Sequence, residues 1–238
     1  VGTAERARRQ RAYLKSDLEF AGATVPQARA VAREFWRSRK ALDRPELLTL
    51  ASVLWQTRLY ERKAVAVELL TRFARRLSAE DLRLVERFVR QARTWALVDP
   101  LAGHVAGDVV TRCPESLEVL DDWAVDDDFW VRRAALLALL HPLRESRSQF
   151  NRFSMFADRM LEDKEFFVRK AIGWVLRDIS RKWPTLVASW VEPRAGRMSG
   201  VTIREATRYL QPDVRDRLME MYRARPRARG GAARETGH

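Results

Sequence analysis

The chain has 238 residues, and its 45 Lys and Arg against 32 Asp and Glu give a formal net charge of +13. This length allows one or two domains with a sizeable core, and we expect one folded domain over 1–222 followed by a disordered basic tail over 223–238. The absence of any window of about 18 uncharged apolar residues argues against a membrane span. The charged segment 1–11 has no apolar stretch typical of a secretory signal, so we expect a cytoplasmic protein.

Cysteine and histidine are too scarce for several classes of site. The single cysteine, Cys113, has no partner for an internal disulfide. The chain has only three histidines, namely His104, His141 and His238. With one cysteine, they are too few to make a tetrahedral zinc site or a histidine-based catalytic triad a good explanation. We therefore expect neither a metal nor another cofactor.

The basic surplus consists mainly of arginine, since only six of the 45 basic residues are lysine. Arginine binds phosphate through two parallel hydrogen bonds, and a surplus of this size is typical of proteins that bind polyanions. Alternatively, the arginine reflects coding bias and lies on a solvated surface.

The apolar residues recur with helical period along the chain, and no long stretch alternates as a strand would. Ser78 with Asp81 three positions later forms a capping box, which predicts a helix over 82–92. Prolines at positions suited to a helix boundary are Pro45, Pro184 and Pro212. The sequence therefore predicts an all-α protein.

The chain also repeats with a period of about 35 residues. The segments DFWVRRAALLALL (128–140) and EFFVRKAIGWVLR (165–177) match strongly, and 59–70, 94–100 and 201–210 fall in the same frame. Such units cannot bury their own apolar faces, so they stack. We expect a solenoid of HEAT-like helix pairs with a concave basic groove. The alternative for the weaker matches is coincidence among amphipathic helices.

The repeat frame assigns the faces of the helix over 165–177. Its buried stripe is predicted to be Val168, Ala171, Ile172 and Val175. On another face, Trp174 lies between Lys170 and Arg177.

One repeat position supplies Lys63, Arg133 and Lys170, which stacking would align into a positive wall for a phosphate backbone. We call these three cations the ladder. The ladder is partial, because the same repeat position holds Val98 and Glu205 in the other two units.

Trp95 and Asp99 are four residues apart and would share one face of a helix. This pair is the most suggestive of chemistry in a chain with little other catalytic equipment. The alternative is structural, with Asp99 as a helix N-cap before Pro100 and Trp95 in the core. Tyr13 lies in a basic segment that is either a polyanion contact or a solvated helix.

Four motifs in order resemble the bacterial DNA alkylation repair enzymes of the AlkD type, which are DNA glycosylases built from HEAT-like repeats. The motifs are AYLKSDLEFAGATVP (12–26), TWALVD (94–99), FWVRRAA (129–135) and EFFVRKAIGWVLR (165–177). The resemblance covers about residues 10 to 210, which is nearly the whole predicted domain.

The resemblance implies a role for each matching residue. Asp99 matches the catalytic aspartate, and Trp95 and Trp174 match the tryptophans that contact the sugar of the lesion. Arg133 matches an arginine near the DNA backbone, and Tyr13 matches an aromatic residue at the edge of the cleft. The resemblance also implies that Arg177 reaches phosphate, and we expect Lys170 and Lys63 to contact DNA as part of the ladder.

The activity implied is base excision repair of double-stranded DNA by a monofunctional alkylpurine DNA glycosylase. It would remove cationic N3- and N7-alkylated purines, bulky adducts among them, without extruding the base, and we expect the enzyme to act as a monomer. Two alternatives from other classes are a non-catalytic HEAT-repeat binder of distorted or branched DNA and a scaffold for acidic protein partners.

Two departures from the family pattern stand out. Ala96, Leu97 and Val98 separate Trp95 from Asp99 where polar residues are expected. The first residue printed is Val1, so we also expect the family's leading helix to be shortened or absent.

Overall fold

A computed structural model describes residues 2–224, which form helices joined by short turns. The described part contains no strand, only one isolated bridge between Glu19 and Leu59. The α-helices are α1 (Ala4–Leu14), α2 (Val25–Ser38), α3 (Arg44–Trp55), α4 (Tyr60–Arg72), α5 (Leu82–Arg90), α6 (Trp95–Pro100), α7 (Gly107–Arg112), α8 (Leu117–Trp123), α9 (Phe129–Ala138), α10 (Leu140–Glu145), α11 (Phe150–Arg159), α12 (Phe166–Ser180), α13 (Pro184–Val191), α14 (Gly200–Ala206) and α15 (Pro212–Arg223). A π-helical stretch, η3 (Leu101–Ala106), joins α6 to α7.

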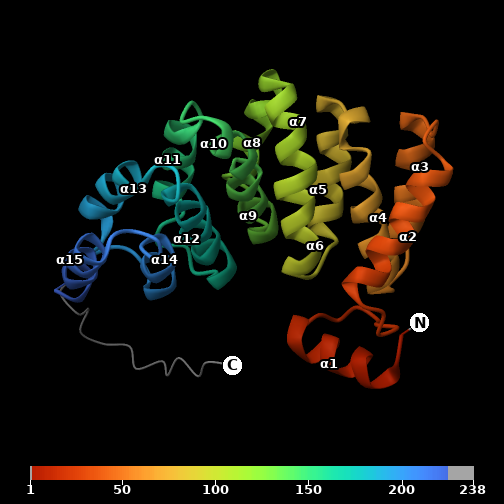
Figure 1. The fold of residues 1–238 in the computed structure, drawn as a ribbon, viewed down its shortest axis with the longest axis horizontal. Helices are drawn as coiled ribbons and strands as arrows, with labels where there is room; N and C mark the ends of the chain where they lie inside the picture. The colour runs from red at the N-terminus through yellow and green to blue at the C-terminus, as the bar shows by residue number, and fades with distance from the viewer. Residues whose placement is uncertain (1, 225–238) are drawn as a thin grey trace.

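The five repeat segments become the helices α4, α6, α9, α12 and α14, and each packs against the next in that order. Other helices pair with this row, as α3 does with α4, α5 with α6, α8 with α9 and α13 with α14. The result is an arch of stacked helices (Figure 1). The predicted all-α helical-repeat solenoid is therefore confirmed.

The stack is also tied by side-chain bonds that span one repeat. Five arginine–aspartate pairs join residues 34 to 37 positions apart: Arg44–Asp81, Arg90–Asp126, Asp99–Arg133, Arg144–Asp178 and Asp158–Arg194. Each pair connects neighbouring units, so these bonds fix the position of each unit relative to the next.

The helix starts follow the capping signals in the sequence. Ser78 and Asp81 form the predicted capping box, with the backbone N–H of Ser78 donating to Asp81 Oδ2 at 2.8 Å. Pro45 lies in the first turn of α3, Pro184 begins α13 and Pro212 begins α15. A proline is tolerated there because the first N–H groups of a helix have no partner within it.

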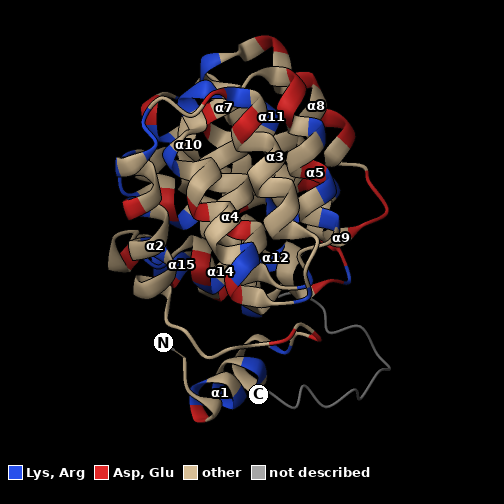
Figure 2. Ribbon diagram, turned by 90° about the vertical axis from the view of Figure 1, so that its right-hand side faces the viewer, with Lys and Arg blue, Asp and Glu red and all other residues tan. Residues whose placement is uncertain are grey.

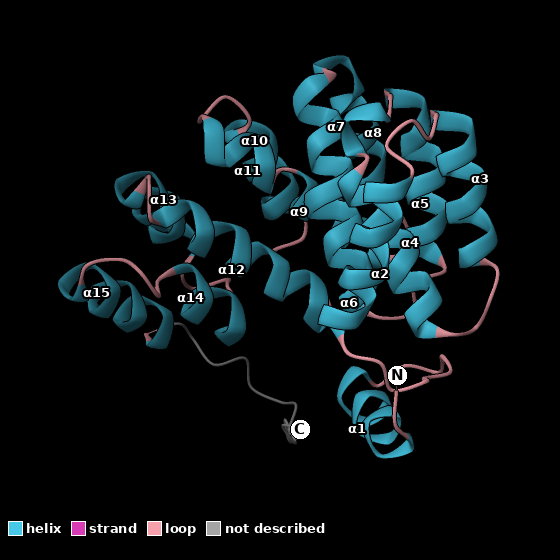
Figure 3. Ribbon diagram, turned by 45° about the vertical axis from the view of Figure 1, so that its right-hand side comes forward, coloured by secondary structure: helices cyan, strands magenta, loops and turns pink. Residues whose placement is uncertain are grey.

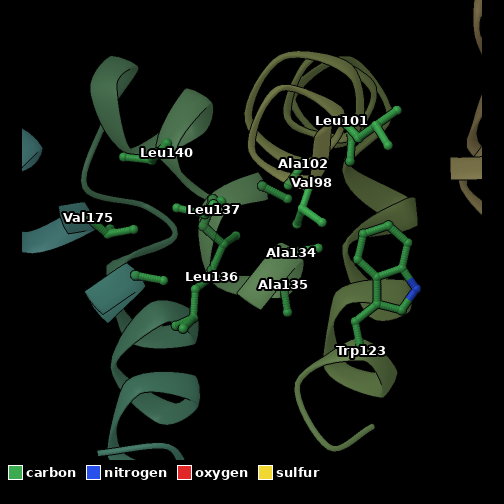
Figure 4. Close-up of a cluster of buried hydrophobic side chains, with 14 of the residues drawn as sticks. Val98, Leu101, Ala102, Trp123, Ala134, Ala135, Leu136, Leu137, Leu140 and Val175 are labelled. Atoms are coloured by element: carbon green, nitrogen blue, oxygen red, sulfur yellow. The ribbon is translucent and has the colours of Figure 1, made fainter. Parts of the chain in front are cut away.

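The core runs through the stack without a break, and Figure 4 shows part of it between α6, α9 and α12. Val98, Leu137 and Val175 from these three helices are fully buried. The predicted stripe of α12, namely Val168, Ala171, Ile172 and Val175, is also fully buried. Burying an aliphatic side chain of this size contributes about 1.5 to 3 kcal/mol, so the stripe fixes the orientation of α12.

Helices α12 and α14 approach closely at Gly173. A Cβ atom there would lie 2.7 Å from the Thr202 carbonyl oxygen and 2.8 Å from Glu205 Cβ. A glycine is therefore needed at this crossing.

Helix α1 lies below the stacked helices in Figure 1 and carries several basic residues (Figure 2). Arg6 and Gln10 donate to the carbonyls of Gly22 and Ala23. The Glu61 carboxylate of α4 accepts the backbone N–H groups of residues 21–23. These polar contacts hold α1 and its following loop against the stack (Figure 3).

The other sequence expectations concern the ends of the chain and the membrane. Of the tail expected over 223–238, only residues 223 and 224 lie within the described residues, at the end of α15. No helix of the described part has the length and apolar character needed to cross a membrane.

Candidate active site

Asp99 lies inside a helix that starts at Trp95. The N-cap of α6 is Thr94, whose hydroxyl accepts the backbone N–H of Ala96. The chain continues from α6 directly into η3, so Asp99 has helical neighbours on both sides. The alternative in which Asp99 is an N-cap is therefore wrong.

The Asp99 carboxylate is held by Arg133 of α9. Arg133 Nε donates to Asp99 Oδ1 at 2.8 Å, and Arg133 Nη2 donates to Oδ2 at 2.9 Å. The Arg133 side chain is 3% exposed and that of Asp99 is 13% exposed. Two parallel bonds of this kind fix the plane of the carboxylate as well as its position, which leaves the Asp99 side chain little freedom to turn.

Arg133 is itself fixed by α12. Its Nη1 donates to the carbonyl oxygen of Phe167, and its guanidinium lies 5.9 Å from the ring centroids of both Phe167 and Trp174. Arg133 thus links Asp99 to the helix that carries Trp174.

The charge state of Asp99 depends on opposing effects. Burial raises the pKa of the Asp99 carboxyl above its ordinary value, whereas Arg133 and, more weakly, Lys170 favour the carboxylate. Arg133 donates to both carboxyl oxygens, and this geometry fits the ionised form.

Tyr13 reaches the same site from α1. Its ring is 73% exposed and meets the Trp95 ring edge-on, with centroids 5.8 Å apart. The polar contacts that hold α1 therefore also place Tyr13 over the start of α6.

These residues line one trough of about 650 Å³. Tyr13, Trp95, Asp99 and Trp174 all border it, and small residues of α4 and η3 such as Gly103 leave space along its floor. The fold thus brings together all four aromatic and acidic residues that the sequence singled out. No group of His, Cys, Asp and Glu suited to hold a metal occurs among residues 2–224.

The expected ladder of cations differs from the prediction at two positions. Lys63 is buried, and its Nζ donates to the Trp55 carbonyl at 2.8 Å and lies 4.3 Å from the Trp55 ring centroid. Arg133 is buried in its pair with Asp99. The prediction of one solvent-facing wall is therefore wrong at these two residues, because each cation has its partners inside the protein.

The other two predicted cations lie nearer the surface. Lys170 is exposed, and its Nζ lies 5.7 Å from the Phe166 ring centroid. Arg177 is half-buried and forms an ion pair with Glu205.

The structure explains one departure from the family pattern. Leu97 and Val98 are buried in the core, so these two positions of α6 take apolar side chains. Two partners of the site were not identified from the sequence, namely the Thr94 cap and the Phe167 carbonyl. A backbone carbonyl leaves no trace in a motif, whereas a threonine directly before Trp95 is a recognisable cap signal.

Comparisons with known proteins agree with this architecture. The family model described as DNA alkylation repair enzyme matches residues 1–210. A comparison with curated proteins finds no match.

Several solved structures are similar to the chain. A predicted DNA alkylation repair enzyme from Enterococcus faecalis is 24% identical, with a TM-score of 0.80 over 89% of this chain and 97% of that one. AlkD2 from Streptococcus mutans is 21% identical, with a TM-score of 0.62 over 86% of this chain and 99% of that one. The structural matches establish the shared fold, and the family model establishes that this chain belongs to the DNA alkylation repair enzyme family.

Proposed function

We propose that the protein is a monofunctional DNA glycosylase, which hydrolyses the N-glycosidic bond of N3- and N7-alkylated purines in duplex DNA. The observation that carries this proposal is the Asp99 carboxylate, fixed by Arg133 at 2.8 and 2.9 Å and bordering a trough with Trp95 and Trp174. Family membership supports action on alkylated DNA.

The proposed reaction suits this set of side chains. An N3- or N7-alkylated purine is already cationic, so the bond from C1′ to the purine breaks with its electron pair moving to the base, and no general acid is needed. The sugar left behind becomes electron-poor. A fixed carboxylate stabilises that charge, and the faces of aromatic rings attract it as well.

Water completes the reaction. A water molecule adds its oxygen to C1′ and gives up a proton, for which Asp99 is the available base. The products are the free purine and an abasic site. Because none of these steps requires a closed pocket around the base, the open trough suits a lesion that stays in the stack, and it leaves room for bulky adducts.

The test compares wild type with Asp99→Asn on duplex DNA that carries 7-methylguanine. The readouts are the released base and the alkali-labile strand breaks. Asparagine keeps the shape of the side chain but removes its charge, so we expect base release to fall by a factor on the order of a hundred or more. Asp127→Asn, at an exposed position in the turn before α9, is the matched control and should retain activity.

Two results would contradict the proposal. Equal release by wild type and Asp99→Asn would remove Asp99 from the mechanism. Tight DNA binding by the wild type without any release would favour the non-catalytic binder of distorted DNA.

A further inference from the structure

One face of α12, together with its C-cap residue Arg181, carries a stripe of aromatic and basic side chains. Phe166, Lys170, Trp174, Arg177 and Arg181 follow one another at spacings of three or four residues, which places them on one side of the helix over about 22 Å. Trp174 lies in the middle of this stripe and borders the trough beside Asp99. The stripe therefore extends away from the proposed active site in both directions.

Beyond Trp174, the stripe meets a basic cluster on the next repeat. Tyr209 lies just after α14 and is 44% exposed. The guanidinium of Arg181 lies 4.2 Å from the centroid of the Tyr209 ring, and that of Arg208 lies 5.9 Å from it. We call Arg181, Arg208 and Tyr209 the tyrosine cluster.

The cations of the tyrosine cluster differ from Arg177 in their partners. Arg177 is paired with Glu205, whereas neither Arg181 nor Arg208 has a carboxylate within ion-pair distance in the described part of the chain. Arg181, Arg208 and Arg177 together lower the pKa of the exposed Tyr209 hydroxyl, and a hydrogen bond from Arg181 is the largest cause. The cluster thus presents two exposed guanidinium groups that no carboxylate of the described residues neutralises.

The chemistry of the cluster favours a phosphate over a base. One face of the Tyr209 ring is occupied by Arg181, so the ring holds the guanidinium in place and is less available to stack on a nucleobase. A guanidinium held in this way keeps N–H donors for a phosphate oxygen. Because the tyrosine cluster lies beyond Trp174 at one end of the stripe, it would contact phosphates that lie some distance from the lesion along the duplex.

We propose that the tyrosine cluster is a second DNA contact, in which Arg181 and Arg208 bind backbone phosphates away from the lesion and set the register of the duplex against Asp99. This inference rests on the proposed action on duplex DNA. Tyr209 acts in it as a positioning residue for Arg181.

The first test measures binding of an undamaged duplex over a salt series. The double variant Arg181→Ala/Arg208→Ala should lower the slope of log affinity against log salt by about 1 to 2, since each lost phosphate contact contributes about 0.9. The matched control is Arg83→Ala/Arg87→Ala, which removes the same charge from exposed positions on α5. Equal slopes for the two double variants would overturn the proposal.

The second test separates positioning from charge. Tyr209→Ala should weaken binding and reduce the salt slope, because Arg181 loses the ring that orients it. Tyr209→Phe keeps the ring and should restore most of the binding. If both variants bind as wild type does, Tyr209 has no positioning role and that part of the proposal fails.

Undamaged DNA keeps this inference distinguishable from the proposed function. If wild type binds the duplex with the expected slopes but releases no alkylated base, the glycosylase proposal fails and the tyrosine cluster stands. If wild type releases the base and the Arg181→Ala/Arg208→Ala variant keeps the wild-type slope, only the tyrosine cluster fails.

Discussion

Replacing Arg133 with methionine removes the guanidinium from Asp99 and leaves an apolar chain of similar length in its place. The resemblance to the AlkD-type enzymes places Arg133 near the DNA backbone, and the predicted positive wall implies that loss of this residue would weaken DNA binding. The structure places this side chain in a buried pair, 3% exposed, with a further bond to the Phe167 carbonyl. We therefore expect Arg133→Met to act mainly through Asp99.

The size of the effect follows from the burial of the pair. Removing one partner of a buried ion pair costs about 3 to 5 kcal/mol in unfolding free energy. The abandoned Asp99 carboxylate can escape by taking up a proton, which costs about 4 kcal/mol near pH 7 but only about 1.5 kcal/mol near pH 5 for an ordinary aspartate. The unpaired charge can therefore lower the unfolding free energy by no more than about 4 kcal/mol near pH 7 and about 1.5 kcal/mol near pH 5.

The sign of the pH dependence follows from the pKa of Asp99, which in the folded variant lies above its value in the unfolded chain. In the variant, the folded state holds a proton on Asp99 at pH values where the unfolded chain has lost it, so the variant gains stability relative to wild type as the pH falls toward 5. Urea unfolding near both pH values measures this difference.

A double-mutant cycle with Asp99→Asn isolates the pair. We expect the Asp99→Asn/Arg133→Met double variant to be less destabilised than the sum of the single variants. Additive losses with no change between the two pH values would show that the two side chains do not interact, which would refute the pairing of Asp99 with Arg133.

Three further predictions concern packing and titration. Gly173→Ala should lower the unfolding free energy by about 1 to 3 kcal/mol because a Cβ there meets the α14 backbone; Gly103→Ala, whose Cβ would meet only the Leu137 carbonyl at 3.8 Å, should melt near wild type. The pKa of Lys63 is lowered by burial to about 8, so unfolding experiments from pH 8 toward 10.5 should show wild type gaining stability relative to Lys63→Met; an unchanged difference would contradict that shift. Base release should fall as the pH drops through the pKa of Asp99, which burial raises above the pKa of an ordinary aspartate. A rate of base release that stays constant down to pH 3.8 would exclude a role for the charge of Asp99.

Much of the fold follows from local signals in the sequence. The match between 128–140 and 165–177 identifies the row of stacked helices, and the Ser78 capping box and the three prolines mark helix starts. The capping box and the prolines act on the backbone within a few residues, and the repeat is visible by comparing two segments of the chain. None of these signals requires knowledge of how the helices pack.

The surroundings of equivalent positions were harder to predict. Lys63, Arg133 and Lys170 share one repeat position, yet two are buried and only Lys170 is exposed. The packing around each position decides the outcome, because the preceding unit offers Arg133 a carboxylate, whereas the paired helix α3 offers Lys63 the backbone carbonyl of Trp55. A usable signal was present in the spacing, since Asp99 and Arg133 are opposite charges 34 residues apart, close to one repeat period.

The bond from Arg133 to Phe167 has a consequence for how such a protein can evolve. Each unit of a solenoid contacts only its neighbours, so a unit can be added or removed while the remaining units still stack. Here the acid, its arginine and the carbonyl that anchors it come from three successive units. Modular change is therefore expected only at the ends of the arch, because excising the middle unit would separate the three parts of the proposed active centre while leaving a molecule that still stacks.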